Sequence, residues 1–183
     1  MNKNFLYIED QKDNFNALKA VANARKIEVD RARYVEEFKE KYDYEKYDGV
    51  IIDALGYMDE KEYSVNADPK SRCLTSCIDF IRNEEKRIKK FIPMAIYTAF
   101  TNVPDEVMAI EGLDEILFAK EEPRSDRKML DYLTKVSEST YDTKIKFNFP
   151  DICKVLNEDY YDSDCKVKYL GHLESLLLEK DLS

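Results

Sequence analysis

The chain has 183 residues, of which 44% are apolar and 37% are charged, with only four Gly and five Pro. This composition fits an ordered, helix-rich protein better than a disordered or fibrous one, and the length allows one domain with a small appendage. A formal charge of −9 and a pI near 4.8 oppose non-specific binding to nucleic acid or to anionic lipid.

Nothing in the sequence predicts a secreted or membrane-integral protein. Residues 1–8 lack the basic region and the long apolar run of a secretory signal, and no apolar run approaches the roughly twenty residues that span a bilayer. The cysteines form no C-x-x-C pair, so we expect a cytoplasmic location. Cys73 and Cys77 lie four residues apart on a predicted helix, but the sole histidine, His172, is distant. Buried or idle thiols are therefore favoured over a metal site.

Short apolar strands alternate with amphipathic helices in the first half of the chain. Residues 5–8 form the first predicted strand, because this β-prone run ends abruptly in the carboxylates of Glu9 and Asp10. A helix follows, with Asp13 available as its N-cap. Its inward face carries Phe15, Leu18, Val21 and Ala22. The alternation continues with a strand over 27–32, a helix over 35–42 and a strand over 49–52 that ends at Asp53.

Residues 54–70 contain Gly, Asn, Pro and scattered charges without any apolar period. We expect a long loop over the strand ends rather than a linker between domains. Long ordered loops often carry function.

The second half of the chain continues the alternation of helices and strands. We predict a helix over 71–90, a strand over 93–98, a short helix over 104–111, a strand over 115–120 and a helix over 125–141. Five successive β-α units predict an α/β fold: a doubly wound, five-stranded parallel sheet with helices on both faces.

Beyond residue 141 this pattern breaks, so we divide the chain into a domain over 1–141 and a helical C-terminal extension over 142–183. The extension is expected to have a basic and aromatic connector over 144–149, helices over 150–160 and 166–179, and a leucine stripe at Leu170, Leu173, Leu176 and Leu177. Residues 143–183 contain six Lys, no Arg and eight Asp or Glu, so their net charge is negative. A negative charge disfavours a DNA-binding output module. A packing appendage or a self-associating helix pair is expected, which leaves a homodimer open.

Polar residues lie at or directly after the carboxyl ends of four of the predicted strands. Glu9, Asp10, Asp53, Thr98 and Lys120 should share one crevice, because ligands of open parallel sheets bind outside the carboxyl ends of the strands. Clustered carboxylates repel one another, and Mg²⁺ relieves that repulsion because it prefers oxygen ligands. One carboxylate can then act as nucleophile toward a phosphoryl group, while the lysine and the hydroxyl hold the other phosphoryl oxygens.

In this order at consecutive strand ends, these residues resemble the receiver domains of two-component response regulators, which have the flavodoxin-like, CheY-like fold. The resemblance covers about residues 4–141. It implies that Glu9 and Asp10 are the acidic pair, Asp53 the phosphoacceptor, Thr98 the hydroxyl switch residue and Lys120 the family lysine.

The resemblance also implies partners and a cofactor. A histidine kinase or phosphotransfer protein would pass phosphate to Asp53, with Mg²⁺ held by Asp10, Asp53 and the backbone carbonyl of Leu55, and with Glu9 completing the acidic set. A downstream protein partner would then bind the face formed by the fourth helix, the fifth strand and the fifth helix, or it would bind the C-terminal helices.

The sequence departs from the family pattern around the site. No proline follows closely after Asp53 or directly after Lys120. The family's switch aromatic lies three residues before the lysine, where this chain has Leu117, with Phe118 one position later. The 54–70 loop is also longer than the family norm.

Three functions remain open at this stage. The first is a phosphorylatable receiver that signals through protein contacts, without enzymatic activity beyond its own phosphorylation and slow dephosphorylation. The second is a degenerate receiver that acts as a protein-binding module. The third is a Mg²⁺-dependent phosphohydrolase, which is disfavoured because Leu55 stands where such an enzyme would need a general acid.

Overall fold

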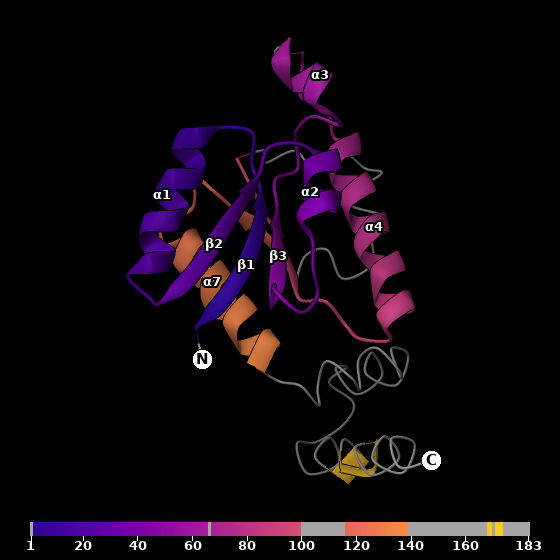
Figure 1. The fold of residues 1–183 in the computed structure, drawn as a ribbon. Helices are drawn as coiled ribbons and strands as arrows, with labels where there is room; N and C mark the ends of the chain where they lie inside the picture. Colours follow the sequence, from indigo (N-terminus) through magenta and orange to yellow (C-terminus); the bar gives the residue numbers. More distant parts are fainter. Residues whose placement is uncertain (1, 66, 100–115, 139–167, 170, 174–183) are drawn as a thin grey trace.

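The computed structural model describes residues 2–65, 67–99, 116–138, 168–169 and 171–173 (Figure 1). Its strands form one parallel five-stranded sheet in the order β2-β1-β3-β4-β5. The strands are β1 (Lys3–Ile8), β2 (Ile27–Ala32), β3 (Gly49–Ile52), β4 (Met94–Thr98) and β5 (Leu117–Ala119). The predicted doubly wound parallel sheet is confirmed.

Helices cover both faces of the sheet. Those in the described residues are α1 (Lys12–Asn23), α2 (Val35–Lys41), α3 (Glu60–Ser64), α4 (Arg72–Ile88) and α7 (Ser125–Glu138). Helices α1 and α7 pack on one face and α2 and α4 on the other, while α3 projects beyond the carboxyl edge of the sheet (Figure 1). Because both faces of the sheet are covered, the sequences of its central strands are nearly continuous apolar runs.

Strand β1 shows how the two cores are divided. Leu6 and Ile8 join the cluster under α2 and α4, whereas Phe5 and Tyr7 join the cluster under α1 and α7. All four are at most 2% exposed. Alternation along a strand sends successive side chains to opposite faces, so a strand covered on both faces needs apolar residues at every position.

The loop predicted over 54–70 contains a helix that sequence analysis missed. Helix α3 has only five residues, which is too short for an apolar period to show. Its N-cap is Asp59, whose side chain accepts a hydrogen bond of 2.8 Å from the backbone N–H of Glu62. At the base of the segment, Gly56 and Lys70 form an isolated antiparallel bridge. The described part of this segment therefore contains regular structure between β3 and α4.

The N-cap expected for the first helix was also wrong. Helix α1 begins at Lys12, and its N-cap is Gln11, two residues before Asp13, with no side-chain cap hydrogen bond. Asp13 lies instead within the first turn, where a negative charge interacts favourably with the helix dipole.

Several predicted elements lie outside the described residues: the helix over 104–111, the connector over 144–149 and the helix over 150–160. Of the helix predicted over 166–179, residues 168–169 and 171–173 are described, and they are helical. In the described part of the chain, no helix combines the length and the apolar character needed to cross a bilayer.

Gly49 offers a direct test of how closely β3 and β4 approach. A Cβ at this position would lie 2.7 Å from the backbone oxygen of Pro93, which also accepts the N–H of Val50 at 2.8 Å. We expect Gly49→Ala to lower the free energy of unfolding by roughly 2 kcal/mol, because the overlap can be relieved only by moving backbone. Urea denaturation of the wild-type protein, Gly49→Ala and the control Gly171→Ala measures the free energy of unfolding. At Gly171 the added Cβ meets nothing within 4 Å, so the control should not be destabilised. A Gly49→Ala variant as stable as the wild-type protein would contradict the predicted overlap.

Candidate functional site

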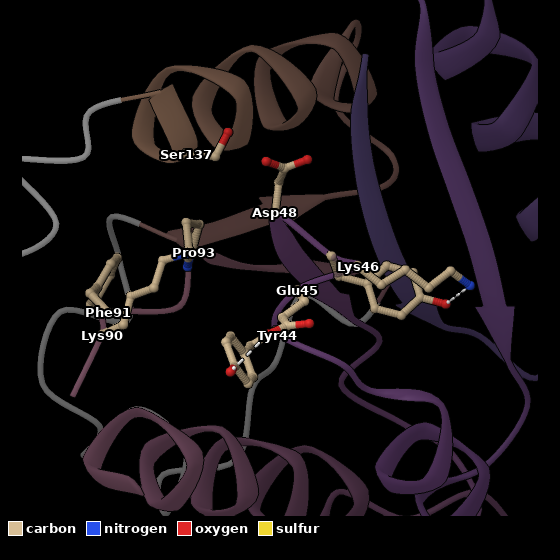
Figure 2. A pocket seen from close by; sticks show the side chains of 9 residues that line it. Tyr44, Glu45, Lys46, Asp48, Lys90, Phe91, Pro93 and Ser137 are labelled. Atoms are coloured by element: carbon tan, nitrogen blue, oxygen red, sulfur yellow. Dashed lines mark hydrogen bonds between the residues drawn. The ribbon is translucent and has the colours of Figure 1, made fainter. Parts of the chain in front are cut away.

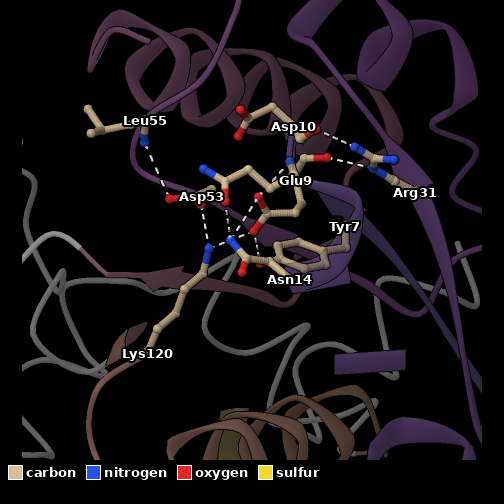
Figure 3. A network of polar contacts seen from close by, with 9 residues as sticks. Tyr7, Glu9, Asp10, Asn14, Arg31, Asp53, Leu55 and Lys120 are labelled. Carbon is tan, nitrogen blue, oxygen red and sulfur yellow. Dashed lines mark hydrogen bonds and ion pairs between the residues drawn. The ribbon is translucent and has the colours of Figure 1, made fainter. Parts of the chain in front are cut away.

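Three carboxylates gather at the carboxyl edge of the sheet. Glu9 and Asp10 directly follow β1, and Asp53 directly follows β3, the strand paired with β1. Each offers an oxygen within 4.8 Å of the others (Figure 3). Glu9 and Asp53 are buried and Asp10 is half-buried. The structure therefore brings together the acidic residues that the sequence singled out.

Lys120 joins two of these carboxylates. Its Nζ lies 2.6 Å from Oε2 of Glu9 and 2.5 Å from Oδ2 of Asp53 (Figure 3). Burial lowers the pKa of this ammonium, but the two adjacent carboxylates outweigh burial and raise it above the ordinary lysine value. Lys120 therefore carries its charge into the cluster.

Thr98 lies at the end of β4 and is buried beside the lysine segment. Its backbone carbonyl accepts a hydrogen bond of 2.7 Å from the backbone N–H of Lys120. This bond extends the pairing of β4 and β5 by one residue, so it fixes where the lysine leaves the sheet.

Glu9 is surrounded by donors. Its Oε2 accepts from the Tyr7 hydroxyl at 2.6 Å as well as from Lys120, and its Oε1 accepts from the backbone N–H of Gln11 at 3.0 Å and from Asn14 Nδ2 at 3.5 Å. Burial raises the pKa of Glu9, but Lys120 and these hydrogen bonds outweigh it, so the pKa lies below the ordinary value. Glu9 is held ionised.

Arg31, at the end of β2, fixes the main chain of the acidic pair. Its Nε donates to the backbone carbonyl of Glu9 at 2.7 Å, and its Nη2 donates to the backbone carbonyl of Asp10 (Figure 3). The Asp10 carboxylate has a raised pKa, first because it is partly buried and second because Glu9 is charged. An added cation would therefore favour the ionised form of Asp10.

Asp53 combines burial with a neighbouring negative charge. Burial raises its pKa to about 6, with Lys120 opposing and Glu9 adding to the rise. Its Oδ1 accepts weakly from the backbone N–H of Leu55, at 3.4 Å. With all groups ionised, three carboxylates face one ammonium, so the cluster has an excess of negative charge and only oxygen ligands. Such a site suits a hard divalent cation.

Sequence analysis missed Tyr7, Asn14 and Arg31. Tyr7 lies two residues before Glu9, so the alternation of a strand places both side chains on the same face. That spacing was the available signal, but a buried tyrosine in a strand is also typical of an ordinary core position. Nothing in the sequence indicates that Arg31, in the next strand, reaches the acidic pair.

A cavity of about 180 Å³ lies elsewhere (Figure 2). Lys46 and Asp48 line it just before β3 begins, and Pro93 lines it just before β4 begins. It is therefore at the amino end of the sheet, opposite the carboxylates, and it takes no part in the site.

Many solved structures with a similar fold are receiver domains. The CheY-like receiver domain protein from Methanospirillum hungatei JF-1 has a TM-score of 0.53 at 12% identity and covers 78% of this chain and 98% of its own. The beryllofluoride-activated NtrC4 receiver domain dimer has a TM-score of 0.52 at 19% identity, covering 75% and 98%. The response regulator receiver protein from Pseudoalteromonas atlantica has a TM-score of 0.51 at 15% identity, covering 74% and 98%.

The chain has the response regulator receiver fold. Its sequence matches no protein-family model and no curated protein. At these identities the likeness concerns the receiver fold alone, so the chemistry has to be argued from the carboxylates and the lysine themselves.

The pKa of Asp53 predicts how stability depends on pH. Between about pH 4 and pH 6 the folded protein keeps a proton on Asp53 that the unfolded chain has released, so ionised Asp53 costs stability above pH 6. In metal-free buffer we expect Asp53→Asn to raise the free energy of unfolding by about 2 kcal/mol near pH 8, and to have no measurable effect near pH 4.

Urea denaturation at the two pH values measures this difference. Asp79→Asn, which changes an exposed carboxylate on α4, is the matched control and should shift stability by less than about 0.5 kcal/mol at either pH. A loss of stability in Asp53→Asn near pH 8 would show that the Lys120 ion pair outweighs burial and repulsion.

Proposed function

We propose that this protein is a signal-transduction receiver that accepts a phosphoryl group on Asp53 in a Mg²⁺-dependent reaction. The observation that carries the proposal is the contact between Lys120 and Asp53 beside two further carboxylates, at the edge of the sheet where open α/β folds bind ligands. The receiver fold supports the same role.

The donor set fits Mg²⁺. Asp10 and Asp53 would hold the ion directly, together with the backbone carbonyl of Leu55, and Glu9 would add its charge. When bound, Mg²⁺ supplies positive charge that offsets the repulsion between the carboxylates and neutralises the charge on a transferring phosphoryl group.

The protein's own groups perform the transfer. A carboxylate oxygen of Asp53 attacks phosphorus, forming an acyl phosphate as the bond from phosphorus to the donor's leaving group breaks. Lys120 already lies against Asp53, so its ammonium needs only a small movement to reach the phosphoryl oxygens. The Thr98 hydroxyl would hold another of these oxygens. The phosphodonor in a cell would be a histidine kinase or a phosphotransfer protein.

We place this receiver unit at residues 1–141 and the helical extension at 142–183. The output would be a protein contact made by the face around β5 and α7, or by the extension. One of the similar structures is a receiver domain dimer, which supports self-association as one form of output. Of the alternatives, the phosphohydrolase has least support, because apolar Leu55 provides no general acid beside Asp53.

Intact mass spectrometry tests the phosphoacceptor. With Mg²⁺ and acetyl phosphate we expect one phosphoryl adduct on the wild-type protein, none without Mg²⁺ and none on Asp53→Asn. Asp79→Asn, which keeps the whole cluster, should form the adduct like wild type. Beryllofluoride binding replaces the adduct as the readout if the acyl phosphate hydrolyses quickly.

Either of two results would contradict the proposal. An adduct that persists on Asp53→Asn would remove Asp53 from its role. A folded wild-type protein that forms no adduct and binds no beryllofluoride would support the degenerate, protein-binding receiver instead.

A further inference from the structure

Tyr7 lies in the core next to Glu9, at the inner side of the acidic cluster. It is 0% exposed, and its hydroxyl donates a hydrogen bond of 2.6 Å to Oε2 of Glu9. The same oxygen accepts from Lys120 at 2.6 Å, and Lys120 in turn contacts Asp53 at 2.5 Å. A continuous chain of short polar contacts therefore runs from the Tyr7 hydroxyl to the proposed phosphoacceptor (Figure 3).

Two tyrosine rings also flank the lysine. The Nζ of Lys120 lies 6.0 Å from the ring centroid of Tyr7 and 5.6 Å from that of Tyr97, the residue before Thr98 on β4. The two rings are 6.4 Å apart and inclined at 52°. An ammonium at these distances from an aromatic ring is attracted by the ring's quadrupole. The two carboxylates and the two rings together thus define where the ammonium rests.

The hydroxyl of Tyr7 is not explained by packing. Its ring lies in the cluster under α1 and α7 with Phe5 and Phe15, where phenylalanine would fill the same space. Burying a phenol is unfavourable unless its hydroxyl is hydrogen-bonded, and Glu9 is the acceptor here. The group that distinguishes tyrosine from phenylalanine therefore acts on the cluster.

The two carboxylate oxygens of Glu9 have different partners. Oε1 accepts from the backbone N–H of Gln11 and from Asn14, whereas Oε2, the oxygen that contacts Lys120, also accepts from Tyr7. If Lys120 moves toward a phosphoryl group, Oε2 loses its cationic partner while Glu9 is still buried. A buried carboxylate that loses a partner is costly, and the Tyr7 hydrogen bond to the same oxygen limits that cost.

We propose that Tyr7 is a positioning residue: its hydroxyl orients the Glu9 carboxylate and, through Glu9, sets the resting position of Lys120 in the acidic cluster. This inference deepens the proposed function and rests on it for its consequences for Mg²⁺. The position of Lys120 in the metal-free protein is independent of phosphorylation and can be tested separately.

The test compares Tyr7→Phe with the control Tyr42→Phe. Tyr42 is partly buried, and it lies on the other face of the sheet against Phe38 and Phe80, with ring centroids 6.3 Å and 5.8 Å away. Each variant removes one phenolic oxygen and keeps the ring. Near-ultraviolet circular dichroism checks that both remain folded.

The first readout is nitrogen NMR of the lysine ammonium groups in metal-free protein. A buried, hydrogen-bonded Lys120 should give a signal protected from exchange with water, assigned by its loss in Lys120→Arg. We expect this signal to broaden or disappear in Tyr7→Phe and to persist in Tyr42→Phe. The second readout is the dissociation constant of Mg²⁺, measured by calorimetry at one fixed pH. We expect it to rise about tenfold in Tyr7→Phe and to stay within about twofold in Tyr42→Phe, because the partners of metal ligands orient them.

The outcomes separate this inference from the proposed function. An equally protected Lys120 signal and an unchanged Mg²⁺ dissociation constant in Tyr7→Phe would overturn the positioning role, even if the wild-type protein accepts phosphate. Loss of the Lys120 signal in Tyr7→Phe, together with no Mg²⁺ binding and no adduct in wild type, would support the positioning of Lys120 and overturn the proposed function.

Discussion

The ion pairs of Lys120 with Glu9 and Asp53 are the interactions on which the site depends. The lysine reaches back across 67 residues to Asp53 and 111 residues to Glu9. Without its ammonium, the buried carboxylates of Glu9 and Asp53 would lose the cation that contacts them both, and unpaired ionised groups in that setting are strongly unfavourable. Arg31 contacts the main chain of the acidic pair, so among the described residues a single ammonium contacts the carboxylates and leaves three acids short of positive charge. That shortage is the physical basis for expecting a divalent ion and, with it, a phosphoryl group.

The order of the strands makes this cluster possible. From β1 the chain passes to β2 on one side, and β3 then pairs with β1 on the other, so Glu9 and Asp10 end beside Asp53. Such a reversal leaves a crevice at the carboxyl edge of an open sheet. Because helices cover both faces, residues 5–8 of β1 and all of β3 are apolar, and the chain becomes polar where these two strands reach the crevice. The covered sheet therefore forms the apolar core, and the polar site residues lie beyond it at the carboxyl edge.

The sequence allowed the sheet and much of the site to be predicted, for one physical reason. A doubly covered strand is apolar throughout, so the carboxylates that follow residues 5–8 and 49–52 stood out as strand ends. Helix α3 could not be predicted, because five residues carry no periodic signal and its start depends on the local bond from Glu62 to Asp59. The role of Tyr7 was hidden for a different reason. Its ring satisfies the core pattern, and only its contact distance to Glu9 reveals the second function of its hydroxyl.

A crystal structure of the protein with Mg²⁺ and beryllofluoride would show whether Asp53 is the phosphoacceptor, because beryllofluoride mimics a phosphoryl group bound to a carboxylate. We expect beryllium on a carboxylate oxygen of Asp53, Mg²⁺ on Asp10, Asp53 and the Leu55 carbonyl, and Lys120 turned from Glu9 toward a fluorine atom. Glu9 should keep its hydrogen bond from Tyr7 in that complex. If the ligands bind elsewhere, or if Lys120 still bridges Glu9 and an unmodified Asp53 at saturating ligand, Asp53 is not the phosphoacceptor.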